Sequence, residues 1–192
     1  ENFGLTVAAQ HQFEREAIIL AGLRPPGLPR VSDHFVIPSQ GQYLVMDFVE
    51  GKSLEELLNE RGGPLAESEV LPWVRQVCDA LDYLHRLAPP VIHRDIKPQN
   101  IIITPDSRAI LVDFGISKVY DPSTSTTVGA RAVTPGYRVP ENYGTGRTNP
   151  RSDVYALGAT IYTLLTEQVP PDSVDLMTGN ETLSPLGAIN PS

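Results

Sequence analysis

Four polar side chains in two short segments have the residue types and the spacing that catalysis requires. Asp95, Lys97 and Asn100 lie close together in residues 93–100 (HRDIKPQN), and Asp113 follows after a short interval. A carboxylate can accept a proton from an alcohol, a lysine can offset negative charge, and amide and carboxylate oxygens can bind Mg²⁺. Each residue taken alone is more simply a solvated loop residue, so the inference rests on the set.

The two segments and a third one carry a family resemblance. HRDIKPQN resembles the catalytic loop of protein kinases, with Ile96 where leucine is commoner. DFG at residues 113–115 resembles the magnesium-binding triplet, and VPE at residues 139–141 stands where that family has Ala-Pro-Glu. The motifs occur in the order and at the spacing of the family, and their style resembles the eukaryotic-like serine/threonine kinases of bacteria.

The resemblance implies phosphoryl transfer from ATP to Ser and Thr hydroxyls of proteins, with Mg²⁺ as the metal. Asp95 would orient the substrate hydroxyl and accept its proton, while Lys97 would place positive charge on the transferring phosphate. Asn100 and Asp113 would be the Mg²⁺ ligands. Thr134 resembles the threonine that contacts the catalytic aspartate and lysine in serine/threonine kinases. His93 is expected to pack rather than react, in a stack with Phe114, Leu20 and Val31.

An ATP site is implied by further matches. Glu16 resembles the helix glutamate that pairs with an ATP-orienting lysine, with Glu14 as its rival and a solvated surface carboxylate as the simpler alternative. Met46 would be the gatekeeper at the end of a strand. The remaining residues are the backbone of Asp47 and Val49 for adenine, and Ile102 with Leu54 below it as the apolar floor.

The loop between the second and third motifs would be the activation segment. Arg94 beside Asp95 suggests regulation by phosphorylation, because a phosphate adds negative charge that suits an arginine partner. The candidate sites are Thr124, Ser125, Thr126 and Thr127. A polar loop that is never modified remains the alternative.

Patterning predicts the elements that must position these residues. Apolar spacing predicts helices over residues 12–22, 53–60, 67–86 and 152–166, and strands over 30–37, 42–49, 91–92, 101–103 and 110–112. Ser53 and Glu56 form a capping box. Pro105-Asp106 predicts a turn, and Asp153 is expected to brace the catalytic-loop backbone. The tail after residue 169 shows no clear element.

The helix over residues 67–86 raises two points. Pro72 fits only a first turn, so the helix should start after Glu67 or be kinked. Its predicted apolar face is Leu71, Val74, Val77, Cys78, Leu81 and Leu84. The single cysteine, Cys78, is therefore expected to be a small buried residue rather than a reactive thiol.

Composition excludes other classes. The net charge of −8 argues against a nucleic-acid-binding face, which needs clustered Lys and Arg. No apolar run approaches the length of a membrane span. A single cysteine excludes an internal disulfide and fits a reducing compartment, so a cytoplasmic location is expected, with a parent protein that could be anchored elsewhere in its sequence. A homodimer for trans-autophosphorylation is a further expected assembly.

The fold class expected from the resemblance is α+β, a protein-kinase-like two-lobe fold. Residues 1–48 would be part of the small β lobe and residues 49–192 most of the mainly helical large lobe. No glycine-rich loop with a strand lysine precedes Glu16, and the helices that usually follow the Asp153 helix are not found. The chain is therefore expected to be a fragment, marginally stable and nearly inactive alone. The alternative is a non-catalytic pseudokinase or scaffold module, against which the retained Asp95, Lys97, Asn100 and Asp113 count.

Overall fold

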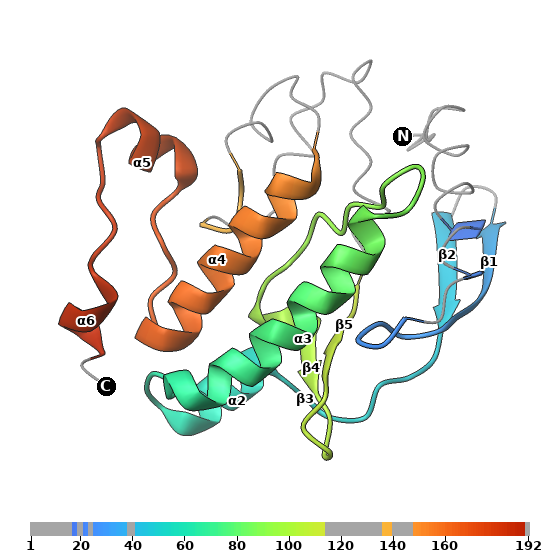
Figure 1. The fold of residues 1–192 in the computed structure, drawn as a ribbon, viewed down its shortest axis with the longest axis horizontal. Coiled ribbons are helices and arrows are strands. Elements are labelled where there is room, and N and C mark those ends of the chain that lie inside the picture. Colours follow the sequence, from blue (N-terminus) through green and yellow to red (C-terminus); the bar gives the residue numbers. More distant parts are fainter. Residues whose placement is uncertain are drawn as a thin grey trace.

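A computed structural model describes residues 17–18, 21–22, 25–37, 41–113, 136–139 and 148–190. Two long helices, α3 and α4, lie beside each other in the middle of the molecule (Figure 1). The strands β1 and β2 lie at one end, and α5 and α6 lie at the other. The helix predicted over residues 12–22 falls mostly outside the described residues.

The first sheet is an antiparallel pair of strands. β1 (Val31–Ile37) pairs with β2 (Gly41–Met46), with Phe35 opposite Tyr43 and their rings stacked 5.3 Å apart. The strand predicted over residues 42–49 ends early, at Met46. The next amide, that of Asp47, donates to the carbonyl of Arg30 (2.9 Å), which lies just outside β1. The chain leaves the sheet there and continues to β3 of the second sheet.

The helix α2 (Leu54–Arg61) begins as its sequence predicts. The Ser53 hydroxyl accepts from the Glu56 amide (3.1 Å), and the Glu56 carboxylate accepts from the Ser53 amide (2.7 Å). This reciprocal pair confirms the capping box. Gly62 ends the helix in the left-handed conformation, at φ 65°.

The helix α3 (Glu67–His85) begins at Glu67, as the predicted range does, so the alternative of a later start is excluded. It continues through Pro72, and its buried face differs in part from the predicted apolar face. Its buried side chains are Val70, Val77, Ala80, Leu81 and Leu84. Cys78 is exposed and Leu71 is 46% exposed.

The second sheet connects the middle of the chain to α2. β3 (Lys52–Ser53), β4 (Ile101–Ile103) and β5 (Ala109–Leu111) are antiparallel in the order β3-β4-β5. The predicted turn at Pro105-Asp106 lies between β4 and β5. Residues 91–92 are not a strand, contrary to the prediction: the Val91 amide donates to the Leu84 carbonyl at the end of α3 (3.1 Å), not to a neighbouring strand.

The last helices lie beyond the second sheet. α4 (Pro150–Thr166) starts after Asn149, whose side chain accepts from the Arg151 amide (2.9 Å). The tail contains two short helices that the sequence did not predict, α5 (Ser173–Thr178) and α6 (Leu186–Ile189).

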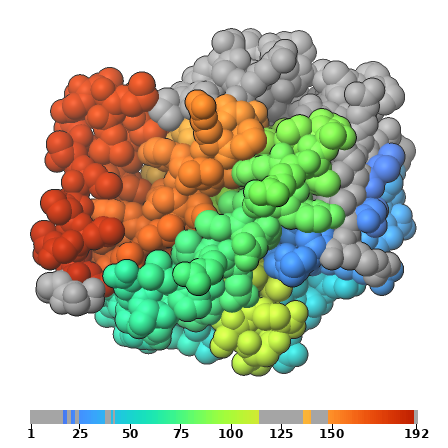
Figure 2. All heavy atoms as spheres, viewed as in Figure 1, coloured from blue at the N-terminus to red at the C-terminus, as the bar shows by residue number. Residues whose placement is uncertain are grey.

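One core joins α2, α3, α4 and the second sheet. Its fully buried side chains include Leu54, Leu84, Ile96, Leu111 and Leu164. Figure 2 shows α3 crossing one face of the molecule, with α4 along one side. Within the described residues, no helix combines the length and the apolar character that crossing a bilayer requires.

Candidate active site

The segment that carries the candidate catalytic residues is a loop ending in one short turn of helix. Residues 93–97 are irregular, and η1 (Pro98–Asn100) is a 3-10 turn that leads directly into β4. Pro98 suits the first position of such a turn because its φ is fixed and it needs no hydrogen-bond acceptor. The Asn100 amide donates to the Lys97 carbonyl (3.0 Å), which closes the turn.

The side chains of Asp95, Lys97 and Asn100 meet inside this turn. Asn100 Nδ2 donates to the backbone oxygen of Asp95 (2.7 Å) and to its Oδ2 (2.8 Å). Lys97 Nζ lies 3.3 Å from the same Oδ2. Asn100 is 4% exposed, and the Asp95 and Lys97 side chains are 11% and 17% exposed. The aspartate is therefore held in one orientation by a cation and an amide in a mostly buried setting.

Asp113 lies two residues after β5, directly after a residue that contacts the catalytic loop. The Val112 amide donates to the Asn100 carbonyl (2.9 Å), so Asp113 lies one residue from a direct contact with the loop. Its side chain is exposed, and its φ is 56°. A residue other than glycine rarely adopts this left-handed conformation, and such strain is common where function fixes a side chain.

The loop backbone is anchored from below by Asp153 of α4. Its carboxylate accepts from the amides of His93 (2.9 Å) and Arg94 (2.9 Å), and it contacts His85 Nε2 (2.8 Å). Asp153 is 1% exposed. The expected brace is present. His85, in the last turn of α3, is an additional partner that sequence reasoning missed, since a histidine at a helix end carries no signal of a distant contact.

His93 packs as expected and does not face solvent. Its exposed fraction is zero, and its Nε2 lies 3.1 Å from the Val112 carbonyl. A carbonyl oxygen can only accept, so Nε2 carries the proton of the neutral ring. Burial lowers the pKa of His93, although the charges of Asp153, Asp95 and Asp113 oppose the shift. The ring is therefore a neutral packing and hydrogen-bonding group.

The predicted adenine-binding stretch follows β2 and leads through β3 to α2. Met46 is partly buried against the core, while Asp47 and Phe48 are exposed, Phe48 to 92%. Because the Asp47 amide already donates to Arg30, its carbonyl is the backbone group left for a ligand. Val49 is half-buried.

Gly51 lets this stretch approach the second sheet. Its φ is 154°, and a Cβ there would lie 2.3 Å from the Ile103 oxygen and 2.8 Å from Ile102 Cγ2. Ile102 is half-buried in β4, while Leu54 is 2% exposed, below the surface in the core. The Ile102 side chain therefore stays partly accessible, whereas Leu54 lies in the interior.

The comparison with protein families settles the class. The model of the family described as protein kinase domain matches residues 6–183. This chain belongs to the protein kinase family. The match includes the loop, the turn and the hairpin described above.

Individual protein kinases show the same relationship. The chain is 34% identical over 172 residues to the probable serine/threonine-protein kinase PknB of Lactococcus lactis, covering 90% of this chain and 26% of that protein. It is 36% identical over 173 residues to the serine/threonine-protein kinase PknL of Mycobacterium tuberculosis, covering 90% of this chain and 41% of that one. The chain thus spans well under half the length of these relatives.

Solved structures agree with the fold. The crystal structure of the Mycobacterium tuberculosis PknI kinase domain superposes with a TM-score of 0.72 at 30% identity, covering 97% of this chain and 66% of that one. The apo form of PpkA-294 gives 0.71 at 28% identity, covering 94% and 62%. The α+β, kinase-like fold expected from the sequence is confirmed.

Several kinase residues expected from the sequence lie outside the described residues. These are Glu16, Leu20, Phe114, Thr124, Ser125, Thr126, Thr127 and Thr134. Arg94 is described: its φ is 70°, and its Nε donates to Thr148 Oγ1 (3.0 Å) just before α4. Val31 is 3% exposed in β1, which fits the packing role expected of it.

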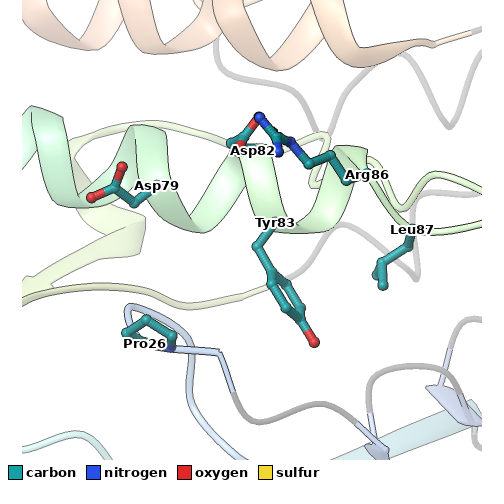
Figure 3. Close-up of a pocket in the computed structure, with 6 residues that line it drawn as sticks. All are labelled: Pro26, Asp79, Asp82, Tyr83, Arg86 and Leu87. Carbon is teal, nitrogen blue, oxygen red and sulfur yellow. Dashed lines mark hydrogen bonds and ion pairs between the residues drawn. The ribbon is translucent and has the colours of Figure 1, made fainter.

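A hollow of about 520 Å³ lies on α3, away from the loop residues (Figure 3). Tyr83 projects from α3 toward the segment that carries Pro26, and Leu87 lies on the loop just after α3. Arg86 Nε donates to Asp82 Oδ1 (2.9 Å). Asp79 completes the lining. None of these residues belongs to the candidate active site.

Proposed function

We propose that this chain contributes the phosphoryl-transfer centre of a protein kinase that moves the γ-phosphate of ATP to Ser and Thr hydroxyls of proteins. The observation that carries the proposal is the shared contact of Lys97 and Asn100 with the Asp95 carboxylate. Residues 1–48 would be part of the small lobe and residues 49–192 most of the large lobe. The cleft between them would hold the nucleotide.

Asp95 is the group that receives the substrate proton. Lys97 and Asn100 stabilise its charged form and fix its orientation, so that a hydroxyl placed against it is aimed and partly deprotonated as it reacts. Lys97 Nζ also lies close enough to Asp95 to contact a phosphoryl group transferred to that hydroxyl. Phosphoryl transfer depends mostly on positioning and on neutralising charge, which this pair provides.

Asn100 and Asp113 fit a magnesium site. Because Nδ2 of Asn100 is committed to Asp95, its Oδ1 is the atom left for a cation. Asp113 adds a carboxylate from the adjacent hairpin. Mg²⁺ takes oxygen ligands, retains waters and shares phosphate oxygens, so two protein ligands suffice. When bound, the ion would neutralise phosphate charge.

The nucleotide would lie between the stretch after β2 and the second sheet. The carbonyl of Asp47 and the backbone of Val49 would bind the adenine edge, with Met46 at the back of the pocket. Ile102 would contact the ring, and Leu54 would support it. Glu16 would pair with an ATP-orienting lysine, for which no match precedes it in this sequence, and Thr134 would contact Asp95 and Lys97.

Regulation through the loop after Asp113 is part of the proposal. A phosphate on Thr124, Ser125, Thr126 or Thr127 would pair with Arg94. Arg94 directly precedes Asp95, and its amide is held by Asp153. A phosphate bound by Arg94 would therefore help to fix the position of Asp95. Trans-autophosphorylation within a homodimer stays a prediction.

The test uses the full-length protein with γ-labelled ATP, Mg²⁺ and a general protein substrate, followed by identification of the labelled amino acid. We expect label on Ser and Thr, and an Asp95→Asn variant should lose about 10²- to 10⁴-fold in kcat, the usual contribution of a positioned acid or base. Asp79→Asn, an equal charge change on the exposed side of α3, should leave the rate unchanged. Undiminished transfer by Asp95→Asn would disprove the assignment.

A further inference from the structure

A threonine just before α4 contacts the arginine of the catalytic loop. Thr148 Oγ1 accepts a hydrogen bond from Arg94 Nε (3.0 Å), although the two residues are far apart in sequence. Both residues are half-buried. The donor is charged and the acceptor is neutral, so the bond is charge-assisted but brings no second charge to the site. The hydroxyl therefore orients the guanidinium without cancelling its positive charge.

The backbone that carries Thr148 is fixed by the start of α4. The Asn149 side chain accepts from the Arg151 amide (2.9 Å), and the Ser152 hydroxyl accepts from the Asn149 amide (3.2 Å). Ser152 is 5% exposed, and α4 packs against both α3 and η1. These caps satisfy backbone donors at the helix start and hold the chain as it enters the helix. The Thr148 hydroxyl is thus presented to Arg94 from a firmly held position.

Arg94 is restrained at both of its ends. Its amide donates to Asp153 Oδ1 (2.9 Å) in α4, and its guanidinium donates to Thr148 just before α4. Its φ of 70° is unfavourable for a residue with a side chain, so the residue keeps this conformation only where its surroundings hold it. Asp95 is the next residue in the chain. Any relaxation of residue 94 therefore moves the carboxylate that is proposed to receive the substrate proton.

The geometry of the guanidinium leaves room for a second role. Arginine has N–H donors on Nε and on both terminal nitrogens, and the contact with Thr148 uses Nε alone. A phosphate can bind through the terminal nitrogens, so the Thr148 contact is compatible with a phosphate on the loop. A guanidinium that is already oriented loses less conformational freedom when such a phosphate binds.

We propose that Thr148 is a positioning residue for phosphoryl transfer: it aligns Arg94, and through it Asp95, before any phosphate is added to the loop. The inference rests on the proposed kinase function and deepens its regulation. Basal activity then depends on a hydroxyl supplied from the start of α4. Phosphorylation of the loop adds to an alignment that exists already.

The experiment measures kcat and KM of the full-length protein after a phosphatase has removed its phosphate, with the removal verified by mass spectrometry. Thr148→Val keeps the side-chain shape and removes the hydroxyl. It should lower kcat by about three- to tenfold, less than the full effect of losing a hydrogen bond to a charged group, because Asp153 still holds the Arg94 amide. KM for ATP should not change. Thr148→Ser, which keeps the hydroxyl, should stay within about twofold of the original kcat.

A double-mutant cycle separates positioning from a general structural role. In an Arg94→Ala background the partner of the hydroxyl is gone, so Thr148→Val should cause no further loss of kcat. If Arg94→Ala does not fold, as judged by urea unfolding, Arg94→Lys serves instead because lysine has no Nε donor. Thr178→Val is the matched control: Thr178 is exposed in α5 and bonds only locally, to the Val174 carbonyl (2.9 Å), so kcat should stay the same.

The outcomes separate this inference from the proposed function. Absence of transfer by the unmutated protein to any protein substrate would overturn the kinase assignment and the inference with it. Normal transfer with an unchanged kcat in Thr148→Val would overturn the positioning role alone. An equal loss of kcat from Thr148→Val with and without Arg94 would show a structural role and would also overturn it, as would a raised KM for ATP at constant kcat.

Discussion

Removing the carboxylate of Asp153 should cost both stability and catalysis. Asp153→Ala leaves the amides of His93 and Arg94 buried without their acceptor and removes the contact with His85. Each unsatisfied buried donor costs about 1–3 kcal/mol. Since His85 is 15% exposed and can reach water, the two amides dominate, and we expect a loss of about 3–5 kcal/mol. An ordinary domain has about 5–15 kcal/mol in total.

The catalytic effect follows from backbone strain. Arg94 is held at φ 70°, a conformation that costs about 1–3 kcal/mol for a residue with a side chain. The hydrogen bond from its amide to Asp153 offsets that cost. Without it, residue 94 should relax toward a negative φ and shift Asp95, and a misplacement of about 1 Å can reduce kcat about 10²-fold.

The assay is urea unfolding of the full-length protein followed by phosphoryl-transfer rates on the folded fraction. Asp79→Ala is the matched control: it removes an exposed carboxylate from α3 and should change the free energy of unfolding by less than about 0.5 kcal/mol. If Asp153→Ala lost less than about 1 kcal/mol and kept its kcat within about twofold, the anchoring argument would be refuted.

Two other predictions concern buried groups. Because burial lowers the pKa of His93, the unfolded chain binds a proton at this ring below about pH 6.5 while the folded chain does not. The free energy of unfolding should therefore fall as the pH drops through that range, by up to about 1.4 kcal/mol per pH unit. His93→Phe should flatten this slope, measured by urea unfolding between about pH 5 and 7. An unchanged slope would contradict the neutral, buried ring. Gly51→Ala should raise KM for ATP and lower the free energy of unfolding by about 2 kcal/mol or more, because its Cβ would collide with the Ile103 oxygen. At Gly62 a Cβ would meet no other atom, so Gly62→Ala should lose only about 1 kcal/mol from backbone strain. Equal losses in the two glycine variants would rule out the close approach.

Local chemistry explains which elements the sequence predicted correctly. The start of α2 depends on Ser53 and Glu56, three residues apart, so the capping box was readable without tertiary information. The β4–β5 hairpin was likewise predicted from two apolar triplets around Pro105-Asp106. The candidate catalytic loop was identified through its resemblance to a protein-kinase motif rather than from local propensity.

The errors arise where tertiary packing decides. Cys78 follows Val77 directly, so it points about 100° away around α3 and reaches solvent, whereas Ala80 packs inward despite its weak hydrophobicity. Residues 91–92 have strand-like side chains, but α3 supplies the hydrogen-bond acceptor for Val91 instead of a neighbouring strand. The helices α5 and α6 are too short for an apolar period to stand out.

The most direct test of a shared phosphoryl-transfer centre is a crystal structure of the full-length protein with a non-hydrolysable ATP analogue and Mn²⁺. The account predicts anomalous density for the metal within about 2.0–2.3 Å of both Asn100 Oδ1 and the Asp113 carboxylate, with the terminal phosphate facing Lys97 and Asp95. Metal and phosphate bound anywhere else, with Asn100 and Asp113 left uncoordinated, would contradict it.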